Sequence, residues 1–190
     1  MNLKKILLIA VVLFAIIILA GAAFMGMIVF DVMSGFATGY DTLTPAGNET
    51  GHALVVYNPA ILGAAKGTAT TIADDLQARG YRVTLAGVRS PAAAATGGYD
   101  VIVVGGPIYA GNQSSSIKSY MKTLTVPAGV KLGMFATGSD KDILKDPIKL
   151  RNEVTSLPDG STLTVKAVVK VVSDDDKAAR CQAFVDELLS

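Results

Sequence analysis

Side chains that usually carry catalysis are scarce in this sequence of 190 residues. It contains one histidine, His52, and one cysteine, Cys181. A hydrolytic triad needs a histidine beside its nucleophile, a cysteine-based zinc site needs several thiolates, and an internal disulfide needs two cysteines. We therefore expect no catalytic side chain and no metal site, and we expect Cys181 to pack against other apolar groups.

The segment over residues 100–121, DVIVVGGPIYAGNQSSSIKSYM, is the most informative stretch. Its apolar run Val101–Val104 is too short for a helix and rich in β-branched residues, which predicts a strand buried on both faces. Gly105-Gly106-Pro107 predicts the end of that strand, because proline cannot continue the hydrogen-bonded ladder. A loop and a helix over about 117–124 follow. In an open α/β sheet, ligands bind at such loops, beyond the carboxyl ends of the strands.

The remaining elements predict the sheet that positions this loop. Four further apolar runs are typical of strands: Ala53–Tyr57, Arg82–Val88, Lys131–Ala136 and Leu163–Val172. Helical patterns separate them: one ends at Arg79-Gly80, one is broken at Asp146-Pro147, and the last starts near Ser173. That last helix is expected to bury Ala178, Cys181, Phe184, Val185 and Leu188. Alternating strands and helices indicate an α/β domain with a doubly wound, five-stranded parallel sheet.

The N-terminus carries a long apolar segment. No charged residue occurs from Ile6 to Phe30, about 25 positions that would span roughly 37 Å as a helix, more than a bilayer core of about 30 Å. Lys4 and Lys5 precede it, and the next basic residue is Lys66, so the positive-inside rule places the N-terminus in the cytoplasm. We expect residues 1–30 to be a single-pass anchor in the lipid bilayer, with the rest of the chain extracytoplasmic. A cleaved signal peptide is the alternative, although its apolar part is usually shorter.

The segment over residues 31–51 is rich in Gly, Thr, Asn and Asp and lacks apolar periodicity, which predicts a flexible linker before a domain over 52–190. Asn48-Glu49-Thr50 within it matches a glycosylation sequon. Without Lys4 and Lys5 the chain has 15 basic residues (17 − 2) against 16 acidic ones. No basic stripe is present, so we expect no nucleic acid partner.

Three motifs resemble the flavodoxin-like family over about residues 53–189. LVVY, a loop containing Gly63 and the run ATTIADDL are similar to the start of a flavodoxin. GGPIYAGNQSSSIKSYM is similar to the flavin-flanking loop of small flavodoxin-like domains, including the flavodoxin-type protoporphyrinogen oxidases, and FATGSD is similar to the second such loop. The resemblance implies the strand order 2-1-3-4-5 and an FMN cofactor at the carboxyl end of the sheet.

The resemblance also implies which residues hold FMN. The phosphate would lie on the loop and helix start formed by Pro59, Ala60, Gly63, Ala64, Ala65 and Lys66. The ring would lie between two further loops, formed by Pro107, Ile108, Tyr109, Ala110 and Gly111 and by Thr137, Gly138 and Asp140. Tyr109 would stack on the ring, and the main chain of Thr137 and Gly138 would reach its edge. The other interpretation of Asp140 is a cap of the following helix.

One loop departs from the family pattern. The pattern is roughly Ser/Thr-x-Thr-Gly-x-Thr, whereas this chain has Ala60-Ile61-Leu62-Gly63-Ala64-Ala65, without hydroxyls. Each hydrogen bond lost to an anionic phosphate is worth about 1.5–3 kcal/mol, which Lys66 would partly offset. Two hypotheses follow. The chain is an anchored electron-transfer flavoprotein with a redox protein or a quinone as its partner, or it is a flavin-free module used for interaction or assembly.

Overall fold

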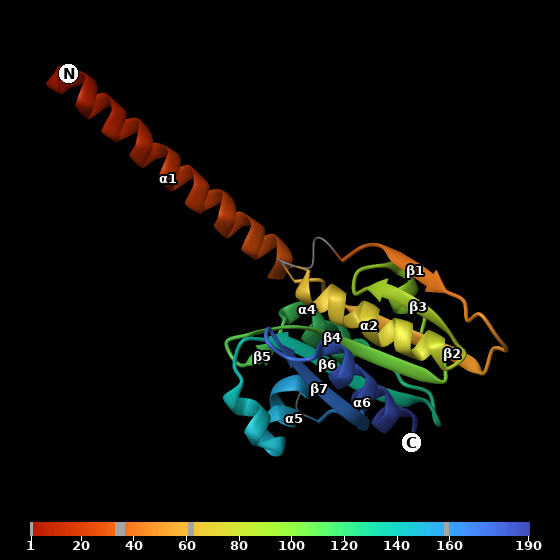
Figure 1. The fold of residues 1–190 in the computed structure, drawn as a ribbon. Helices are drawn as coiled ribbons and strands as arrows, with labels where there is room; N and C mark the ends of the chain where they lie inside the picture. Colours follow the sequence, from red (N-terminus) through yellow and green to blue (C-terminus); the bar gives the residue numbers. More distant parts are fainter. Residues whose placement is uncertain (1, 33–36, 61–62, 158–159) are drawn as a thin grey trace.

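The computed structural model describes residues 2–32, 37–60, 63–157 and 160–190. A long helix, α1 (Leu3–Val32), projects from an α/β domain formed by the rest of the chain (Figure 1). The C-terminus lies at the opposite end of the domain from this helix (Figure 1).

The sheet has five parallel strands and one antiparallel strand at its edge. Its order is β1-β3-β2-β4-β6-β7, with the short β5 paired to β4 alone. The strands are β1 (Tyr40–Leu43), β2 (Gly51–Tyr57), β3 (Tyr81–Gly87), β4 (Val101–Tyr109), β5 (Asn112–Gln113), β6 (Lys131–Gly138) and β7 (Val165–Val172). The parallel strands β3, β2, β4, β6 and β7 confirm the predicted order 2-1-3-4-5. Below, "carboxyl end of the sheet" means the end at which these five strands finish.

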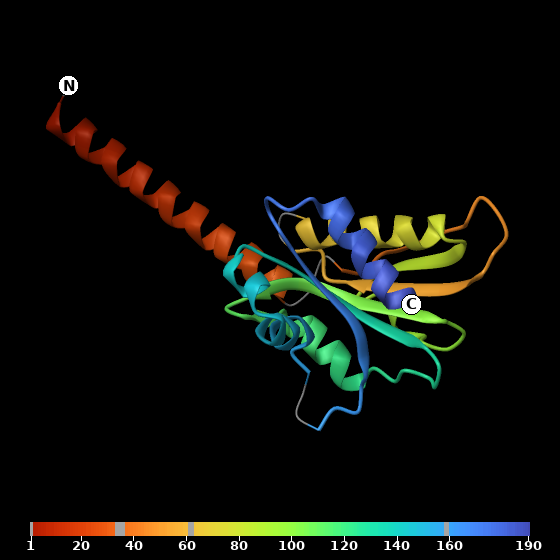
Figure 2. The ribbon, with the colours of Figure 1, turned by 60° about the horizontal axis from the view of Figure 1, so that its bottom comes forward.

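Helices cover both faces of the sheet (Figure 2). Helices α2 (Ala64–Ala78) and α6 (Lys177–Leu189) pack on one face, against Val55, Val103 and Phe135. The other face, with Leu54, Ile102 and Met134, is covered by α3, α4 and α5. Their bounds are α3 (Pro91–Ala94), α4 (Ser115–Thr123) and α5 (Pro147–Thr155), preceded by the 3₁₀ helix η1 (Asp142–Lys145). Successive strand residues therefore pack alternately into two separate cores, one on each face of the sheet. This explains the continuous apolar runs of the central strands.

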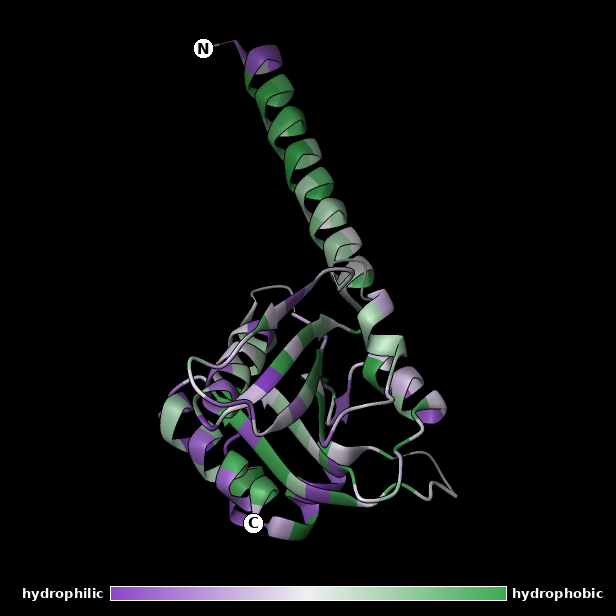
Figure 3. Ribbon diagram, turned by 90° about the vertical axis from the view of Figure 1, so that its right-hand side faces the viewer, coloured by the Kyte–Doolittle hydropathy of each residue, from purple (hydrophilic) through white to green (hydrophobic). Residues whose placement is uncertain are grey.

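Helix α1 differs from every other helix in its surface. The segment Lys4–Met27 has a mean hydropathy of 3.2, and none of it is buried against the domain. In Figure 3 the ribbon of this helix is green to pale after its purple first turn, whereas the domain helices mix purple and green residues. By length and composition α1 can cross a membrane.

The prediction of an unstructured linker over 31–51 is wrong for part of that segment. Residues 31 and 32 belong to α1, and β1 pairs antiparallel with β3, with Tyr40 opposite Ala86. The N–H groups of Gly87 and Arg89 donate to the carbonyls of Gly39 and Ala37, each at 2.8 Å. An edge strand that is held through its main chain leaves most of its side chains in solvent. Its sequence therefore lacks the apolar alternation that would have revealed it.

Three further boundaries differ from the predictions. Strand β4 continues through Gly105-Gly106-Pro107 to Tyr109, because β2 ends opposite Gly105 and no longer requires an N–H donor at Pro107. Strand β7 begins at Val165, two residues later than predicted. Helix α6 begins after Asp176, whose Oδ1 accepts the Ala179 N–H at 3.1 Å, so Ala178 lies in the exposed first turn.

Candidate functional site

A cleft of about 730 Å³ lies at the carboxyl end of the sheet, between the start of α2 and the ends of β4, β6 and β7. Helix α2 contributes Ala64 and Thr68, and Ala60 comes from the loop before it. The strand ends contribute Pro107, Ile108, Tyr109, Thr137, Gly138, Ser139, Val171 and Val172. Ser173, Asp175 and Lys177 come from the chain after β7, and Phe24 of α1 also lines the cleft. Ligand sites in proteins are typically of this size and are mostly apolar, as these walls are.

The loop after β2 is held in place by a buried asparagine. Asn58 is fully buried, and its Nδ2 donates to Ser116 Oγ at 2.9 Å, at the start of α4. Its Oδ1 accepts the Ala60 N–H at 3.1 Å. Asn58 therefore ties the expected phosphate loop to the segment after β4. The sequence signal was a lone polar residue directly after an apolar strand, and the sequence interpretation did not use it.

Some main-chain N–H groups of this loop donate hydrogen bonds to carbonyls of the same loop. The Gly63 N–H donates to Ala60 O at 3.1 Å, and the Lys66 N–H donates to Pro59 O at 3.3 Å. Ala64 and Ala65 occupy the first two positions of α2, where N–H groups have no carbonyl acceptor within the helix. Among the described residues of this helix start, these two amides are the ones best placed to meet a phosphate. Residues 61 and 62 of the expected loop lie outside the residues that the structure describes.

The structure gathers some of the expected phosphate residues and separates others. Ala60 and Ala64 line the cleft, whereas Pro59, Gly63, Ala65 and Lys66 do not. Ala65 is buried in the core beneath α2, and Lys66 is exposed on the outer side of the helix start. The Thr68 hydroxyl donates to Ala64 O at 3.2 Å, so it acts as a helix hydroxyl, as expected.

A lysine that the sequence interpretation missed lies beside the start of α2. Lys177, in the first turn of α6, lines the cleft, and its Nζ is 3.5 Å from the point that a Cβ on Gly67 would occupy. Neighbouring Asp175 accepts the Val172 N–H at 2.9 Å and forms an ion pair with Arg180 at 2.8 Å. Lys177 and the dipole of α2 thus provide positive charge at one end of the cleft. Because 110 residues separate Lys177 from Gly67, no local motif pairs them.

The other end of the cleft is apolar and aromatic. Pro107, Ile108 and Tyr109 of β4 line it, together with Thr137 and Gly138 of β6. Both groups of residues come from the two loops expected to flank a flavin ring, so the structure brings these predicted residues together.

Three other expected residues do not line the cleft. Ala110 and Gly111, with φ of 48° and 75°, form the tight turn into β5. Such a pair of positive φ values is typical of a two-residue hairpin turn. Asp140 Oδ1 accepts the Asp142 N–H at 2.9 Å, so this carboxylate caps the turn before η1, which agrees with the alternative interpretation.

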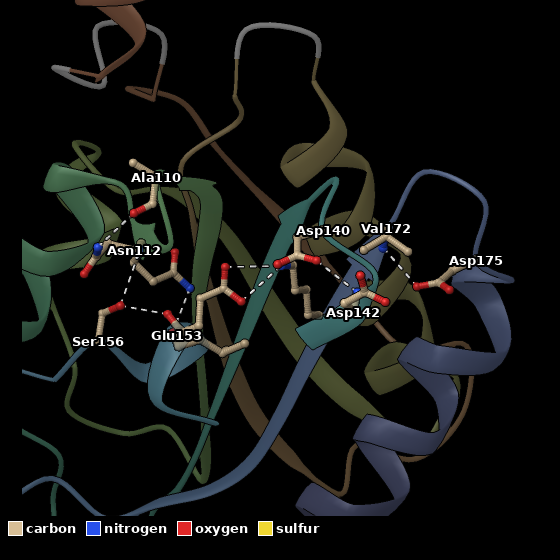
Figure 4. Close-up of polar contacts among 11 residues, drawn as sticks. Ala110, Asn112, Asp140, Asp142, Glu153, Ser156, Val172 and Asp175 are labelled. Carbon is tan, nitrogen blue, oxygen red and sulfur yellow. Dashed lines mark hydrogen bonds and ion pairs between the residues drawn. The ribbon is translucent and has the colours of Figure 1, made fainter. Parts of the chain in front are cut away.

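An ion pair is buried beneath the end of β6. Lys170 Nζ lies 3.0 Å from Glu153 Oε2, and the two side chains are 1% and 7% exposed. A Cβ on Gly138 would lie 3.1 Å from Lys170 Cε, so the lysine stem packs directly under this cleft residue. Nearby, Gln113 Nε2 donates to Phe135 O at 2.8 Å and to Val154 O at 2.9 Å. Figure 4 shows the polar contacts along this end of the sheet.

Comparison with known proteins bears on the fold. No family model matches the sequence, and no curated protein matches it significantly. Among solved structures, an NADH:FMN oxidoreductase in its apo form matches with a TM-score of 0.54 and 19% identity, over 73% of this chain and 88% of that chain. A short-chain flavodoxin associated with a non-canonical PDU bacterial microcompartment matches with a TM-score of 0.54 and 20% identity, over 73% and 96%. Oxidised flavodoxin 2 from Bacillus cereus matches with a TM-score of 0.52 and 17% identity, over 73% and 97%.

The fold is flavodoxin-like. At these identities the matches establish architecture alone, and the chemistry of the site must come from its own residues. In this flavodoxin-like domain the cleft contains an aromatic and apolar end at Tyr109 and a cationic end at Lys177. The residues present therefore fit a molecule with a planar ring and an anionic tail.

Proposed function

We propose that the flavodoxin-like domain binds FMN in this cleft and takes part in electron transfer as a membrane-anchored protein. The observation that carries the proposal is the joint presence of Tyr109 and the Thr137–Gly138 main chain in one cleft at the carboxyl end of the sheet. Ligands of open α/β sheets bind at this place. The similar solved structures, which include flavodoxins and an NADH:FMN oxidoreductase, support the same cofactor class.

Each wall of the cleft has a role under this proposal. Tyr109 packs against the ring, and Ile108 and Val171 exclude water from its apolar part. Lys177 and the N–H groups of Ala64 and Ala65 hold the phosphate in place of the missing hydroxyls. Bound FMN supplies the one- and two-electron chemistry, so the chain itself needs no acid–base side chain.

A flavin-free interaction module is the second candidate. The loop geometry favours it, because the N–H groups of Gly63 and Lys66 already donate to carbonyls of their own loop. The loop also lacks the hydroxyls that would hold a phosphate. Under this hypothesis the cleft is an inherited feature without a cofactor.

Titration of the purified full-length chain with FMN separates the two candidates. We expect micromolar or tighter binding, measured by the quenching of flavin fluorescence. Tyr109→Ala should weaken binding about ten-fold, because an aromatic stacking contact is worth roughly 0.5–1.5 kcal/mol beyond its buried area. Tyr109→Phe is the matched control and should retain most of the affinity. Absence of micromolar FMN binding by the unmodified chain would favour the interaction module.

A second comparison tests the cationic end of the cleft. Lys177→Gln should weaken binding of FMN about ten-fold, because a charge-assisted hydrogen bond is worth roughly 1.5–3 kcal/mol. Riboflavin has the same ring but no phosphate, so its affinity should not change in this variant. Equal losses for both ligands would show that Lys177 does not bind the phosphate.

The proposed location rests on α1. We propose that this helix crosses the cell membrane once, with Lys4 and Lys5 on the cytoplasmic side and the domain outside the cytoplasm. Its length and its mean hydropathy of 3.2 support a membrane crossing, and the two lysines in its first turn support the proposed orientation. Under it, the redox partner is a protein or a quinone that reaches the outer side of the membrane.

A further inference from the structure

We propose that the carboxyl end of the sheet docks on the headgroup surface of the bilayer that α1 crosses. This inference rests on the proposed anchoring by α1 and does not depend on FMN. The surface consists of the start of β1, the residues after β3, the start of α2 and the first turn of α5. Its partner is an anionic phospholipid surface.

The connection between anchor and domain is short at this end. Residues 33–36 separate Val32, the last residue of α1, from Ala37, so five Cα–Cα steps span at most about 18 Å. Ala37 is 1% exposed, and its carbonyl accepts the Arg89 N–H at 2.8 Å. Arg89 lies two residues beyond the carboxyl end of β3. The chain therefore enters the domain at the end that contains the cleft, and this end must stay near the bilayer.

Two large exposed apolar side chains lie at the same end. Within the part of the chain that the structure describes, Tyr40 (58%) and Ile148 (75%) are the large apolar residues outside α1 that are strongly exposed. Tyr40 is paired with Ala86 at the end of β3, and Ile148 is in the first turn of α5, after β6 and η1. Tyrosine is enriched at membrane–water interfaces, and an exposed isoleucine can bury apolar area there.

Two basic residues at this end can contact anionic lipid. Lys66 and Arg89 are both exposed there, in the first turn of α2 and two residues after the end of β3. Three carboxylates at this end are paired with lysines, Asp174 with Lys141, Asp142 with Lys145 and Asp146 with Lys149. Asp41 and Asp140 are also exposed at this end. Basic residues near a bilayer are attracted by anionic headgroups.

The cleft itself provides a further observation. Phe24 lies within the apolar segment of α1 and also lines the cleft, so the cleft and the membrane-spanning helix are on the same side of the domain. Figure 1 shows α1 leaving the domain beside the start of α2. Docking of this surface would open the cleft toward the lipid–water interface.

Fluorescence quenching in lipid nanodiscs tests the orientation. The full-length chain receives a single fluorophore at Asn112→Cys, in the β4–β5 hairpin at the carboxyl end, or at Ala128→Cys, in the loop before β6 at the opposite end. Both positions are exposed, whereas native Cys181 is fully buried and should remain unlabelled. With nitroxide headgroup lipids in anionic discs, we expect at least three-fold stronger quenching at position 112. Equal quenching, or stronger quenching at 128, would overturn the proposal.

Charge reversal tests the lipid contact. Lys66→Glu with Arg89→Glu should reduce the quenching at position 112 at least two-fold in anionic discs and leave it unchanged in neutral discs. Lys122→Glu is the matched control, because Lys122 is exposed near the end of α4 and away from this surface. Unchanged quenching in the double variant would refute the contact with anionic lipid.

A flotation experiment tests the anchoring by α1 separately from the docking of the domain. The chain should float with vesicles after an alkaline carbonate wash if α1 is inserted. A chain that does not float refutes the anchoring and with it the docking. A chain that floats but shows equal quenching at positions 112 and 128 refutes only the docking.

Discussion

At the scale of single residues, the ion pair between Lys170 and Glu153 is the least expected feature. Both side chains are almost fully buried, and their charged atoms lie 3.0 Å apart between β7 and α5. Burying two charges carries a large desolvation penalty that mutual attraction offsets only when the geometry is good. The pair therefore adds little net stability as a unit, but each charge depends strongly on the other.

Replacing one member of this pair should lower the free energy of unfolding far more than replacing both members. We expect Lys170→Met to lower the free energy of unfolding by about 3–5 kcal/mol, because it leaves the Glu153 carboxylate buried and alone. Lys170→Met with Glu153→Leu should recover most of that loss. Urea unfolding followed by tyrosine fluorescence measures both variants. A single variant within 1 kcal/mol of the unmodified protein would contradict this view of the pair.

Cys181 gives the stability a pH dependence. Burial raises the pKa of its thiol to about 11, and Asp75 adds to the rise while Lys177 opposes it. A pKa raised in the folded state means that the contribution is complete below the unfolded pKa, near 9, and is lost as pH rises toward 11. We expect the free energy of unfolding to fall by an amount on the order of 2 kcal/mol over that window.

A matched variant isolates the contribution of the thiol. In Cys181→Ala the fall between pH 9 and 11 should be clearly smaller, as measured by urea unfolding at several pH values. Tyr120, whose pKa is raised from 10.0 to about 12 mainly by burial, should lower the stability of both proteins alike between pH 10 and 12, so the difference between them reports the thiol. An equal pH dependence in Cys181→Ala would exclude the thiol as its source.

At the scale of elements, β4 depends on its glycines. A Cβ on Gly105 would lie 2.2 Å from Phe135 O and 2.4 Å from the Phe135 ring, so β6 would have to move. Glycine here therefore allows the Phe135 ring to cross β4, and it does not end the strand. The same strand then continues to Tyr109 in the cleft.

Substitution of this glycine should be unusually disruptive. We expect Gly105→Ala to lower the free energy of unfolding by about 3 kcal/mol, the upper part of the range for overpacked cores. Gly97→Ala is the control, because no heavy atom lies within 4 Å of its added Cβ and the residue is exposed. The control should stay within about 0.5 kcal/mol of the unmodified protein. Similar losses in both variants would show that the close contact with Phe135 is not the cause.

The strand β1 illustrates another property of elements. It pairs with the edge of β3 that would otherwise expose unpaired main-chain groups to other chains. It also places the entry of the chain at the carboxyl end of the sheet. Within the segment predicted as a linker, Tyr40–Leu43 therefore belongs to the sheet.

At the scale of the whole molecule, anchor and domain form a polarised arrangement. A lysine pair lies in the first turn of α1, and the proposed topology places everything after this helix outside the cytoplasm. If the cleft end docks on the bilayer, a small carrier dissolved in the lipid, such as a quinone, has easier access to the cleft than a large soluble protein.

The topology is open to a direct labelling experiment. A cysteine introduced at Ala128 should react with a membrane-impermeant maleimide in intact cells, because the proposed topology places the domain outside the cytoplasm. Replacing Lys4 and Lys5 by glutamate should reduce the labelled fraction several-fold, since the charge asymmetry that orients α1 is removed. Labelling that requires cell lysis would contradict the proposed orientation.

The residues alone were sufficient for the fold class and the apolar N-terminal helix. These two properties follow from local apolar periodicity and from turn residues, which are readable within one segment of the chain. The order of the five parallel strands was implied only by the resemblance to the flavodoxin-like family. The two loops around Tyr109 and Thr137 were also predictable, because parallel strands bring their carboxyl ends together.

Only the tertiary structure decided the remaining features. Lys177 beside Gly67, Asn58 beside Ser116 and the pairing of β1 with β3 each join segments far apart in the chain. The engagement of the Gly63 and Lys66 amides within their own loop depends on main-chain angles rather than on residue types. Local patterns record which face of an element is buried, but side chains that meet across elements are set by packing, and this is why the details of the cleft appeared only in the folded domain.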